Sequence, residues 1–367
     1  MKFSPQLECL EKRCCLAASA FVQGDTLIIR ADNRANVVEI FDDGVDRIQV
    51  SVDGVFLTDT RSRNQNGSHS HSSSGDDNRQ RNQNGSQSNS SSSDDNRNGN
   101  RNGSHSNSNS SDDGQGGNPG QSDFFTGIDR VVVQTMKGND SVSYTLTGEL
   151  INSRSLDINL GDGNDDAVFD FMAGVASPEL RVNVLGQAGK DAVAADFGAV
   201  TGTNVSLSAN LGKGNDSLDL VLSEGLFDDA ALRVNARGGD GNDFLNVSAD
   251  AQVHIDSLAL LDLNLLGDAG ADRITVDYLG ALDGDLLLRA AGGKGNDAVA
   301  VHLDLDPGSA GLVSARVLGD AGNDNLKLKI WNAEDLASID ALLDGGAGRD
   351  TFSTTANVTV RRGERRV

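Results

Sequence analysis

Several residue types are scarce in this chain, and each scarcity narrows the fold. The sequence of 367 residues has 3 cysteines, all within the first fifteen positions, so no disulfide framework holds the remainder. The 4 prolines leave strands almost uninterrupted. Aromatic residues make up 4% and all hydrophobic residues 37%, which favours narrow stacked coils over a thick globular core. No run of 18 apolar residues occurs, so we expect no transmembrane segment.

The charge of the chain is one-sided and concentrated. The net charge is −23, and residues 123–360 carry −22, whereas residues 60–122 are neutral and the last seven carry +3. Such an acidic body repels phosphates, so we expect no nucleic-acid partner. Divalent cations are the partners that it favours, because they bind carboxylate oxygens. A soluble, self-repelling acidic surface is the alternative interpretation.

Residues 1–23 form a targeting-like segment. Lys2 precedes a short apolar stretch and Ala18–Ala20 looks like a cleavage site, but Glu8 and Glu11 interrupt the pattern of a secretory signal. Residues 3–17 resemble the short L-E-x-L-E-x-R-x-L-L-A motif that begins many large envelope or exported proteins of planctomycete-type bacteria, with the three cysteines as departures. This resemblance implies a bacterial protein that is secreted or held at the cell surface.

Residues 60–122 form a low-complexity tract of Ser, Asn, Gly, Asp, Arg, Gln and His. The tract has a period of 18, since Arg63–Ser68 recurs as Arg81–Ser86. With nothing apolar to bury, it cannot offset the entropy of ordering, so we expect it to be disordered. We interpret its histidines as solvated spacer residues; a weak metal-binding role is the alternative.

Residues 24–59 alternate in the manner of β-strands, for example at Val37–Ile40 and Ile48–Val52. We expect them to form the first strands of the body that follows. Asp46-Arg47-Ile48 resembles a degenerate copy of the turn described below. The low-complexity tract is then a long insertion in a loop near the N-terminal end of that body, or a linker between two units.

One short turn recurs through residues 123–360. Each copy has a glycine two residues before an aspartate and a hydrophobic residue two residues after it, at spacings of 25 to 29 residues. A period of this length marks a solenoid. The nine aspartates are Asp140, Asp165, Asp191, Asp216, Asp243, Asp272, Asp297, Asp324 and Asp350.

Apolar residues alternate with polar ones on both sides of every turn. Counting from the aspartate as zero, positions −9, −7 and +2 are apolar in all nine repeats, whereas position −8 is mostly polar or charged. Period two on both sides indicates two half-buried strands in each repeat of about 26 residues. We therefore predict an all-β fold, a parallel β-solenoid that resembles a β-helix or β-roll. A train of antiparallel hairpins is the alternative.

The turn residues themselves suggest a ligand. Glycine at −2, and the frequent asparagine at −1, suit positive φ and need no ligand to explain them. Nine aspartates at one position do need one, because stacked coils bring their carboxylates about 4.8 Å apart, where like charges repel. Ca²⁺ fits this column, since it takes six to eight oxygen ligands. We predict that these nine aspartates bind up to eight ions between nine turns; a turn cap with diffuse counterions is the alternative.

The turns resemble the RTX (hemolysin-type) calcium-binding repeat, G-G-x-G-x-D-x-U-x. Gly238–Leu245, Gly292–Val299 and Gly345–Phe352 match it fully, and the other six copies match in part. The resemblance covers about 220 residues and implies Ca²⁺ bound by aspartates and turn carbonyls in a β-roll, usually of a secreted protein. The family's motifs recur every nine residues. Here they recur about every 26, so only one side of each coil carries the motif.

Signatures of catalysis are missing. No EF-hand loop occurs, the glycines precede no helical pattern, and only two histidines lie outside the low-complexity tract. His302 falls at an outward strand position, where a surface residue is expected. Tyr144, Tyr278 and Trp331 are too scattered to mark a polysaccharide groove.

These observations lead to one functional hypothesis. We expect an exported calcium-binding β-solenoid, not an enzyme, with a structural or adhesion-like role at the cell surface or in the extracellular matrix. Its partners would be calcium ions and a polysaccharide or protein of that surface. The alternatives are a polysaccharide lyase or hydrolase, or a carbohydrate-binding module, on a β-helix. The basic tail of residues 361–367 would contact an acidic neighbour or fray.

Overall fold

The computed structural model describes residues 18–59, 123–332 and 336–361. These residues form strands, turns and loops, and among them no helix is long and apolar enough to cross a membrane. The predicted disorder of residues 60–122 and the role of the basic tail beyond Arg361 fall outside the described residues, as does the motif within residues 3–17.

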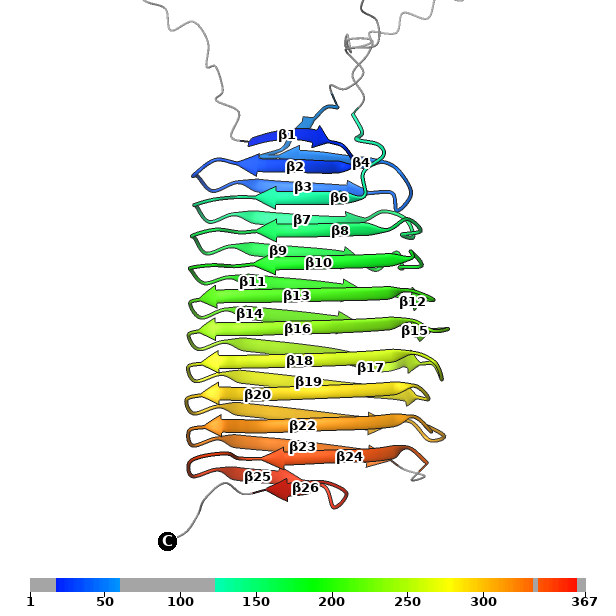
Figure 1. Cartoon of the computed structure of the whole chain (residues 1–367), viewed down its shortest axis with the longest axis vertical. Coiled ribbons are helices and arrows are strands. Elements are labelled where there is room, and N and C mark those ends of the chain that lie inside the picture. The colour runs from blue at the N-terminus through cyan, green and yellow to red at the C-terminus, as the bar shows by residue number, and fades with distance from the viewer. Residues whose placement is uncertain (1–17, 60–122, 333–335, 362–367) are drawn as a thin grey trace, which may run out of the picture. The chain divides into compact units, whose positions relative to one another are not determined.

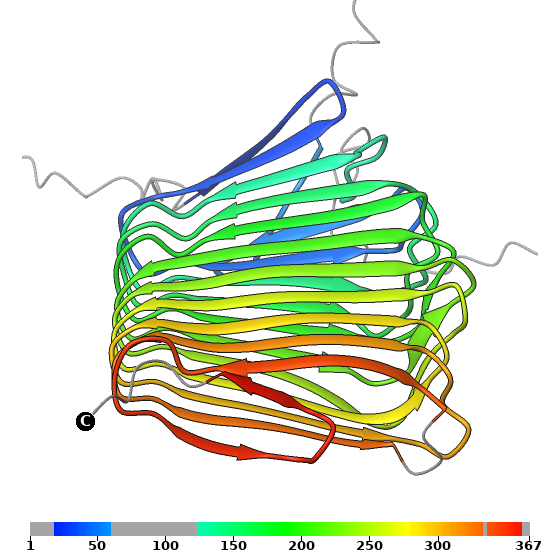
Figure 2. The same ribbon diagram turned by 60° about the horizontal axis from the view of Figure 1, so that its bottom comes forward.

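Two large sheets, here called sheet A and sheet B, lie face to face (Figures 1 and 2). In order, sheet A contains β1 (Ala18–Gln23), β2 (Thr26–Ala31), β6 (Arg130–Gln134), β8 (Arg154–Asn159), β10 (Glu179–Leu185), β13 (Asn204–Lys213), β16 (Ala231–Asp240), β18 (Leu260–Ala269), β20 (Asp285–Lys294), β22 (Leu312–Ala321), β24 (Ser338–Asp344) and β26 (Thr359–Arg361). Sheet B contains β25 (Thr351–Thr354), β23 (Asn325–Asn332), β21 (Ala298–Leu305), β19 (Arg273–Leu282), β17 (Phe244–Ile255), β14 (Ser217–Leu222), β11 (Ala192–Phe197), β9 (Asp166–Phe171), β7 (Ser141–Leu146), β3 (Val37–Asp42), β4 (Ile48–Val52) and β5 (Val55–Leu57).

The predicted parallel β-solenoid is confirmed. Each coil runs along sheet A, turns at the Gly-x-Asp motif, runs back along sheet B, and returns through a variable loop (Figure 1). Every repeat strand pairs in parallel with its counterpart in the next coil; Leu218 of β14, for example, pairs with Leu245 of β17. The hairpin alternative is wrong, because within the described residues antiparallel strand pairs occur only near the N-terminal end, between β1 and β2, β3 and β4, and β4 and β5.

The core is a thin layer between the sheets, as the alternation predicts. Inward positions such as Val182, Leu207 and Val234 are at most 1% exposed. At the return-loop edge, β12 (Val200–Thr201) and β15 (Gly225–Phe227) add a short ladder that also includes the end of β17. Parallel stacking therefore continues around much of each coil, and every coil repeats the geometry of its neighbour.

The first coil is formed by β2 and β3, which pair with β6 and β7. The strands before and after the low-complexity tract thus belong to the same two sheets. Of the targeting-like segment, Ala18–Gln23 forms β1, which pairs with β2 at one end of sheet A.

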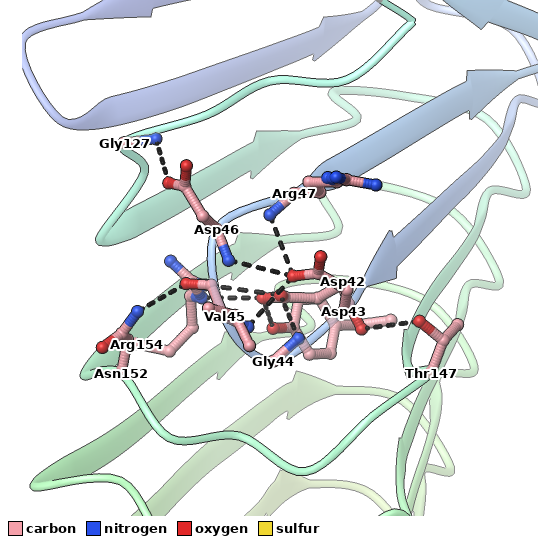
Figure 3. Close-up of polar contacts among 11 residues, drawn as sticks. Asp42, Asp43, Gly44, Val45, Asp46, Arg47, Gly127, Thr147, Asn152 and Arg154 are labelled. Carbon is pink, nitrogen blue, oxygen red and sulfur yellow. Dashed lines mark hydrogen bonds and ion pairs between the residues drawn. The ribbon is translucent and has the colours of Figure 1, made fainter.

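The interpretation of Asp46 as a degenerate turn copy is wrong. Asp46 lies in the loop between β3 and β4, where its carboxylate accepts a hydrogen bond from the backbone N–H of Gly127 at 2.6 Å (Figure 3). The residue that corresponds to the turn aspartates is Asn36, because Val37 pairs with Ser141, the residue after Asp140. Sequence spacing hides this equivalence, since 104 residues separate Asn36 from Asp140.

A buried ion pair lies in the same N-terminal region. Asp42 at the end of β3 is fully buried and lies 2.7 Å from the Nε of Arg154, which is also buried (Figure 3). The hydroxyl of Tyr144 donates a hydrogen bond to Asp42 at 2.5 Å. Asp43 accepts three backbone N–H bonds; burial opposes its charge, but these bonds outweigh it and lower the pKa of Asp43 below 3.8.

Candidate metal centre

All nine Gly-x-Asp turns lie at one edge of the solenoid, where sheet A passes into sheet B. The register of sheet B pairs the residue after each aspartate with the residue after the next, as in Ser217 with Phe244 and Phe244 with Arg273. The structure therefore brings the nine aspartates into one column with one member per coil.

The glycine at −2 is required by the stacking of the coils. Eight of the nine have φ between 130° and 156°, a region that side chains rarely adopt. From Gly163 to Gly348, an added Cβ would stand 1.3 to 1.5 Å from the carbonyl oxygen of the preceding coil's glycine. The coils can approach to strand spacing only because neither of these residues carries a side chain.

Position −4 also has positive φ in every repeat, between 67° and 107°. Five repeats place glycine there, whereas the others place Met136, Gln187, Asp268 and Asp320. A non-glycine residue with positive φ costs on the order of 1 kcal/mol and persists only where its surroundings fix it. The turn conformation is thus set by the stacking of the coils and not only by local preference.

One carboxylate oxygen of each aspartate ties its coil to the preceding one. Oδ1 of Asp165 accepts the backbone N–H of Asp140 at 2.7 Å, and the same bond joins every later pair at 2.8 to 3.0 Å. The ladder begins at Asn36, whose N–H donates to Asp140 at 2.7 Å. Either asparagine or aspartate could supply this acceptor. The ladder therefore explains why a short polar side chain stands at this position, but it does not explain why that side chain is negatively charged.

The other carboxylate oxygen is buried and has no hydrogen-bond partner. This holds for Oδ2 of the eight aspartates from Asp140 to Asp324, whose residues are 0 to 2% exposed. A buried carboxylate oxygen without a donor costs several kcal/mol while it is charged. Diffuse counterions do not contact a group buried in this way, so an ordered water, a proton or a directly bound cation has to satisfy it.

Oδ2 packs closely against the backbone at −5 in most turns. A Cβ added to Gly186, Gly238, Gly267, Gly292, Gly319 or Gly345 would stand 2.3 to 2.6 Å from Oδ2 of the same turn. For Gly267 and Gly319 the same point lies 2.5 and 2.6 Å from the −5 carbonyl oxygen of the following coil. Glycine at −5 therefore lets the carboxylate approach the backbone, where a side chain would collide with it.

Three turns lack this glycine. Leu160 and Leu211 take position −5 before Asp165 and Asp216, and both leucines are fully buried. Thr135 takes the position before Asp140, and its hydroxyl donates a hydrogen bond to the carbonyl oxygen of Leu160. The eight turns with an unpartnered Oδ2 thus divide into five with glycine at −5 and three with another residue there.

Burial raises the pKa of the eight aspartates from Asp140 to Asp324. Burial has the largest effect on the pKa, and the charges of neighbouring aspartates raise it further. The hydrogen bond that each carboxylate accepts from a backbone N–H lowers the pKa. The pKa is about 6 at Asp165, Asp243 and Asp324, and about 7 at Asp191 and Asp272. Near neutral pH the metal-free column is therefore poised between charged and protonated forms.

The donor set fits a hard cation. Among the described residues no group of three or more His, Cys, Asp or Glu side chains gathers to hold a metal. An ion in this column would instead take carboxylate Oδ2 atoms and backbone carbonyl oxygens. Oxygen-only ligation with several carbonyls suits Ca²⁺ and suits Zn²⁺ or copper poorly. Mg²⁺ fits less well, because it requires near-octahedral geometry.

Asparagine at −1 has a second role that the sequence analysis missed. Its side-chain Oδ1 accepts the backbone N–H of the −1 residue in the next coil: Asn164 donates to Asn139 at 3.0 Å, and Asn242 donates to Asn215 at 2.8 Å. The expected positive φ at −1 is wrong, because none of these asparagines has positive φ. Their recurrence in register was the available signal for a side-chain ladder parallel to that of the aspartates.

Comparisons with known proteins add little. No family model matches the sequence, so the RTX resemblance rests on its motif residues alone, and no curated protein matches. Among solved structures, the chain is similar to the X-ray crystal structure of a hyperactive, Ca²⁺-dependent, β-helical antifreeze protein from an Antarctic bacterium. The identity is 22%, the match covers 64% of this chain and 78% of that one, and the TM-score is 0.24. Such a score carries no argument about function, and the fold described above rests on strand register.

Proposed function

We propose that this protein is a calcium-binding β-solenoid in which Ca²⁺ neutralises the aspartate column and thereby stabilises the stacked coils. One observation carries the proposal: eight buried carboxylate oxygens have no hydrogen-bond partner within the protein, and five of them pack against the backbone of a glycine at −5. Turn carbonyls from the next coil would complete the ligand set of an ion bound there.

The stability of the solenoid would then depend on calcium. Without the ion, the column must bind protons or bear mutual repulsion at a spacing of about 4.8 Å. With it, each ion joins two coils, so binding energy becomes folding energy. Eight unpartnered oxygens set an upper limit of eight ions, and the five turns in which glycine at −5 lets Oδ2 approach the backbone are the sites expected to fill first.

We further propose that the protein is exported and has a structural or adhesion-like role at the cell surface or in the matrix, without catalysis. Millimolar extracellular calcium would keep such sites occupied. The acidic body and the targeting-like first residues support this role, and a surface polysaccharide or protein is its proposed partner.

The direct test is a calcium titration of the chelated protein followed by circular dichroism and by isothermal titration calorimetry. We expect a cooperative gain in β-signal or in melting temperature, with five to eight ions bound per chain. Magnesium at the same concentration is the control, and an equal response to magnesium would overturn the assignment of selective calcium sites.

A further inference from the structure

The outer faces of the two sheets differ in how many of their charged residues form ion pairs within the chain. On sheet A, cations pair with acids of the same chain: Arg130 lies 2.6 Å from Asp157, and Arg316 lies 2.5 Å from Asp340. On sheet B, His302 lies 3.6 Å from Asp277, and Lys329 and Arg273 lie over the rings of Trp331 and Phe244. The acids Asp166, Asp170, Asp196 and Asp219 and the cations Lys327, Lys329 and Arg273 form no ion pair within the described part of the chain. Sheet B thus presents several charges that have no ion-pair partner in their own chain.

The four acids without an ion pair and the two lysines lie toward opposite ends of the solenoid. The four acids lie on β9, β11 and β14, whereas the two lysines lie on β23 (Figure 1). Asp277 on β19 and Asp304 on β21 also face outward. Strand β17 is the third strand from β9 and also the third from β23. Its outer face carries Phe244, which is 38% exposed, with Asn246 and Ser248.

Strand register places opposite charges at mirrored positions of one column. Asp170 pairs with Asp196, and the register continues through Val221, Ser248 and Asp277 to His302 and Lys329. His302 also lies 3.6 Å from Asp277 of its own chain. Counted from Ser248 at the centre, Asp170 and Lys329 are each three strands away. Asp196 and His302 are each two strands away.

We propose that the outer face of sheet B binds the same face of a second copy of this chain, with the two solenoids stacked in opposite order. The two-fold axis runs parallel to the strands over β17. Such a rotation keeps each position along a strand and exchanges the strands on either side of the centre. Lys329 then faces Asp170 of the partner subunit, His302 faces Asp196 of the partner subunit, and Phe244 lies near the axis.

The face suits close contact. Between the charged positions it carries small side chains such as Ala192, Ala194, Ala298 and Ala300. Seven strands spaced about 4.8 Å apart, with about six residues in each, cover roughly 650 Å². Two such faces bury roughly 1,300 Å² in total, which lies within the range of stable protein interfaces.

The repulsion among the acids also favours a cationic partner. The pKa of Asp196 is raised by burial first and then by the charges of Asp170 and Asp219. A lysine or protonated histidine from the facing copy would relieve that repulsion, whereas a polyanionic partner would increase it. The charge pattern therefore favours a second copy over an acidic polysaccharide on this face.

The experiment is sedimentation velocity of the full chain in saturating calcium, with a reducing agent present because of the N-terminal cysteines. We expect a dimer at about 100 µM protein in 50 mM salt, and weaker association at 500 mM, where screening shortens the reach of charge. Lys329→Asp and Asp170→Lys should each weaken dimerisation about tenfold or more, because each places like charges opposite one another twice.

An equimolar mixture of the two variants is the decisive experiment. A Lys329→Asp chain and an Asp170→Lys chain carry opposite charges at both contacts, so an equimolar mixture should form heterodimers although each variant alone is monomeric. Arg233→Asp, on the outer face of sheet A, is the matched control and should leave the wild-type dimer intact. Circular dichroism confirms that each variant is folded. A monomeric wild type, failure of the mixture to associate, or equal loss in the control would overturn the proposal.

Discussion

Replacing Asp272 by asparagine separates the structural role of this aspartate from its proposed metal-binding role. Asparagine keeps an Oδ1 atom that can accept the N–H of Asp243, so the ladder between the coils survives. It removes the charge at Oδ2, which is buried without a partner beside Gly267. The substitution should therefore have opposite effects in the absence and presence of calcium.

The magnitude without calcium follows from the pKa. Asp272 has a pKa of about 7 in the fold against 3.8 for the unfolded chain. A shift of about 3 units corresponds to roughly 4 kcal/mol of destabilisation once the group is ionised. Asparagine removes this destabilisation, but its own amide loses hydration on burial. We therefore expect the substitution to stabilise the chelated protein by about half of the 4 kcal/mol, near 2 kcal/mol at pH 7.5. The melting temperature of the chelated variant should rise by about 4 to 8 °C.

Calcium should reverse the sign. A site held at a thousand times its dissociation constant adds about 4 kcal/mol to the stability of the wild type, and the variant lacks it. The variant should then unfold roughly 4 to 8 °C below the wild type. Differential scanning calorimetry in EGTA and in calcium measures both effects. Asp216→Asn, where Leu211 replaces the glycine at −5, should show a smaller loss in calcium. An equal loss with and without calcium for Asp272→Asn would refute the reasoning.

Three further predictions follow from the geometry. The folded pKa values of about 6 to 7 in the column exceed the unfolded value of 3.8, so protonation favours the fold. The chelated protein should therefore gain thermal stability as pH falls from 8 to 5. The calcium-loaded protein should lose thermal stability over the same range, because protons displace the ion. Gly241→Ala should cost several kcal/mol in urea unfolding, because its Cβ would meet the oxygen of Gly214 at 1.4 Å, whereas Gly308→Ala, with open space around it, should cost about 1 kcal/mol. Arg154→Met should cost about 3 to 5 kcal/mol by the same assay, since it leaves Asp42 buried without its cation; a cost below 1 kcal/mol would show that the pair contributes little.

Much of the fold was predictable because the coils repeat. Period two on both sides of each turn gave two strands per coil, and the constant spacing gave parallel stacking in register. The strands of the first coil were predicted, but its turn was assigned wrongly to Asp46, because Asn36 replaces aspartate and an insertion separates it from the next turn. Its place is fixed by the pairing of Val37 with Ser141, which no local pattern reveals.

The candidate site was predictable as a column of residues but not as a set of atoms. The sequence identified the nine aspartates, yet the division of labour between Oδ1, which joins the coils, and Oδ2, which is left without a partner, depends on how the coils stack. The role of glycine at −5 likewise appears only when Oδ2 of Asp243 is seen beside Gly238. Ladders of this kind are tertiary contacts between stacked coils, so the conformational propensities of single residues do not predict them.

A crystal structure of the protein grown with calcium, with anomalous scattering to locate the ions, tests the central claim most directly. The account predicts a single row of peaks along the turn edge, each about 2.3 to 2.6 Å from an aspartate Oδ2 atom and from backbone carbonyl oxygens. Peaks confined to the exposed acids of the sheet faces, or a calcium-soaked column that holds none, would contradict it.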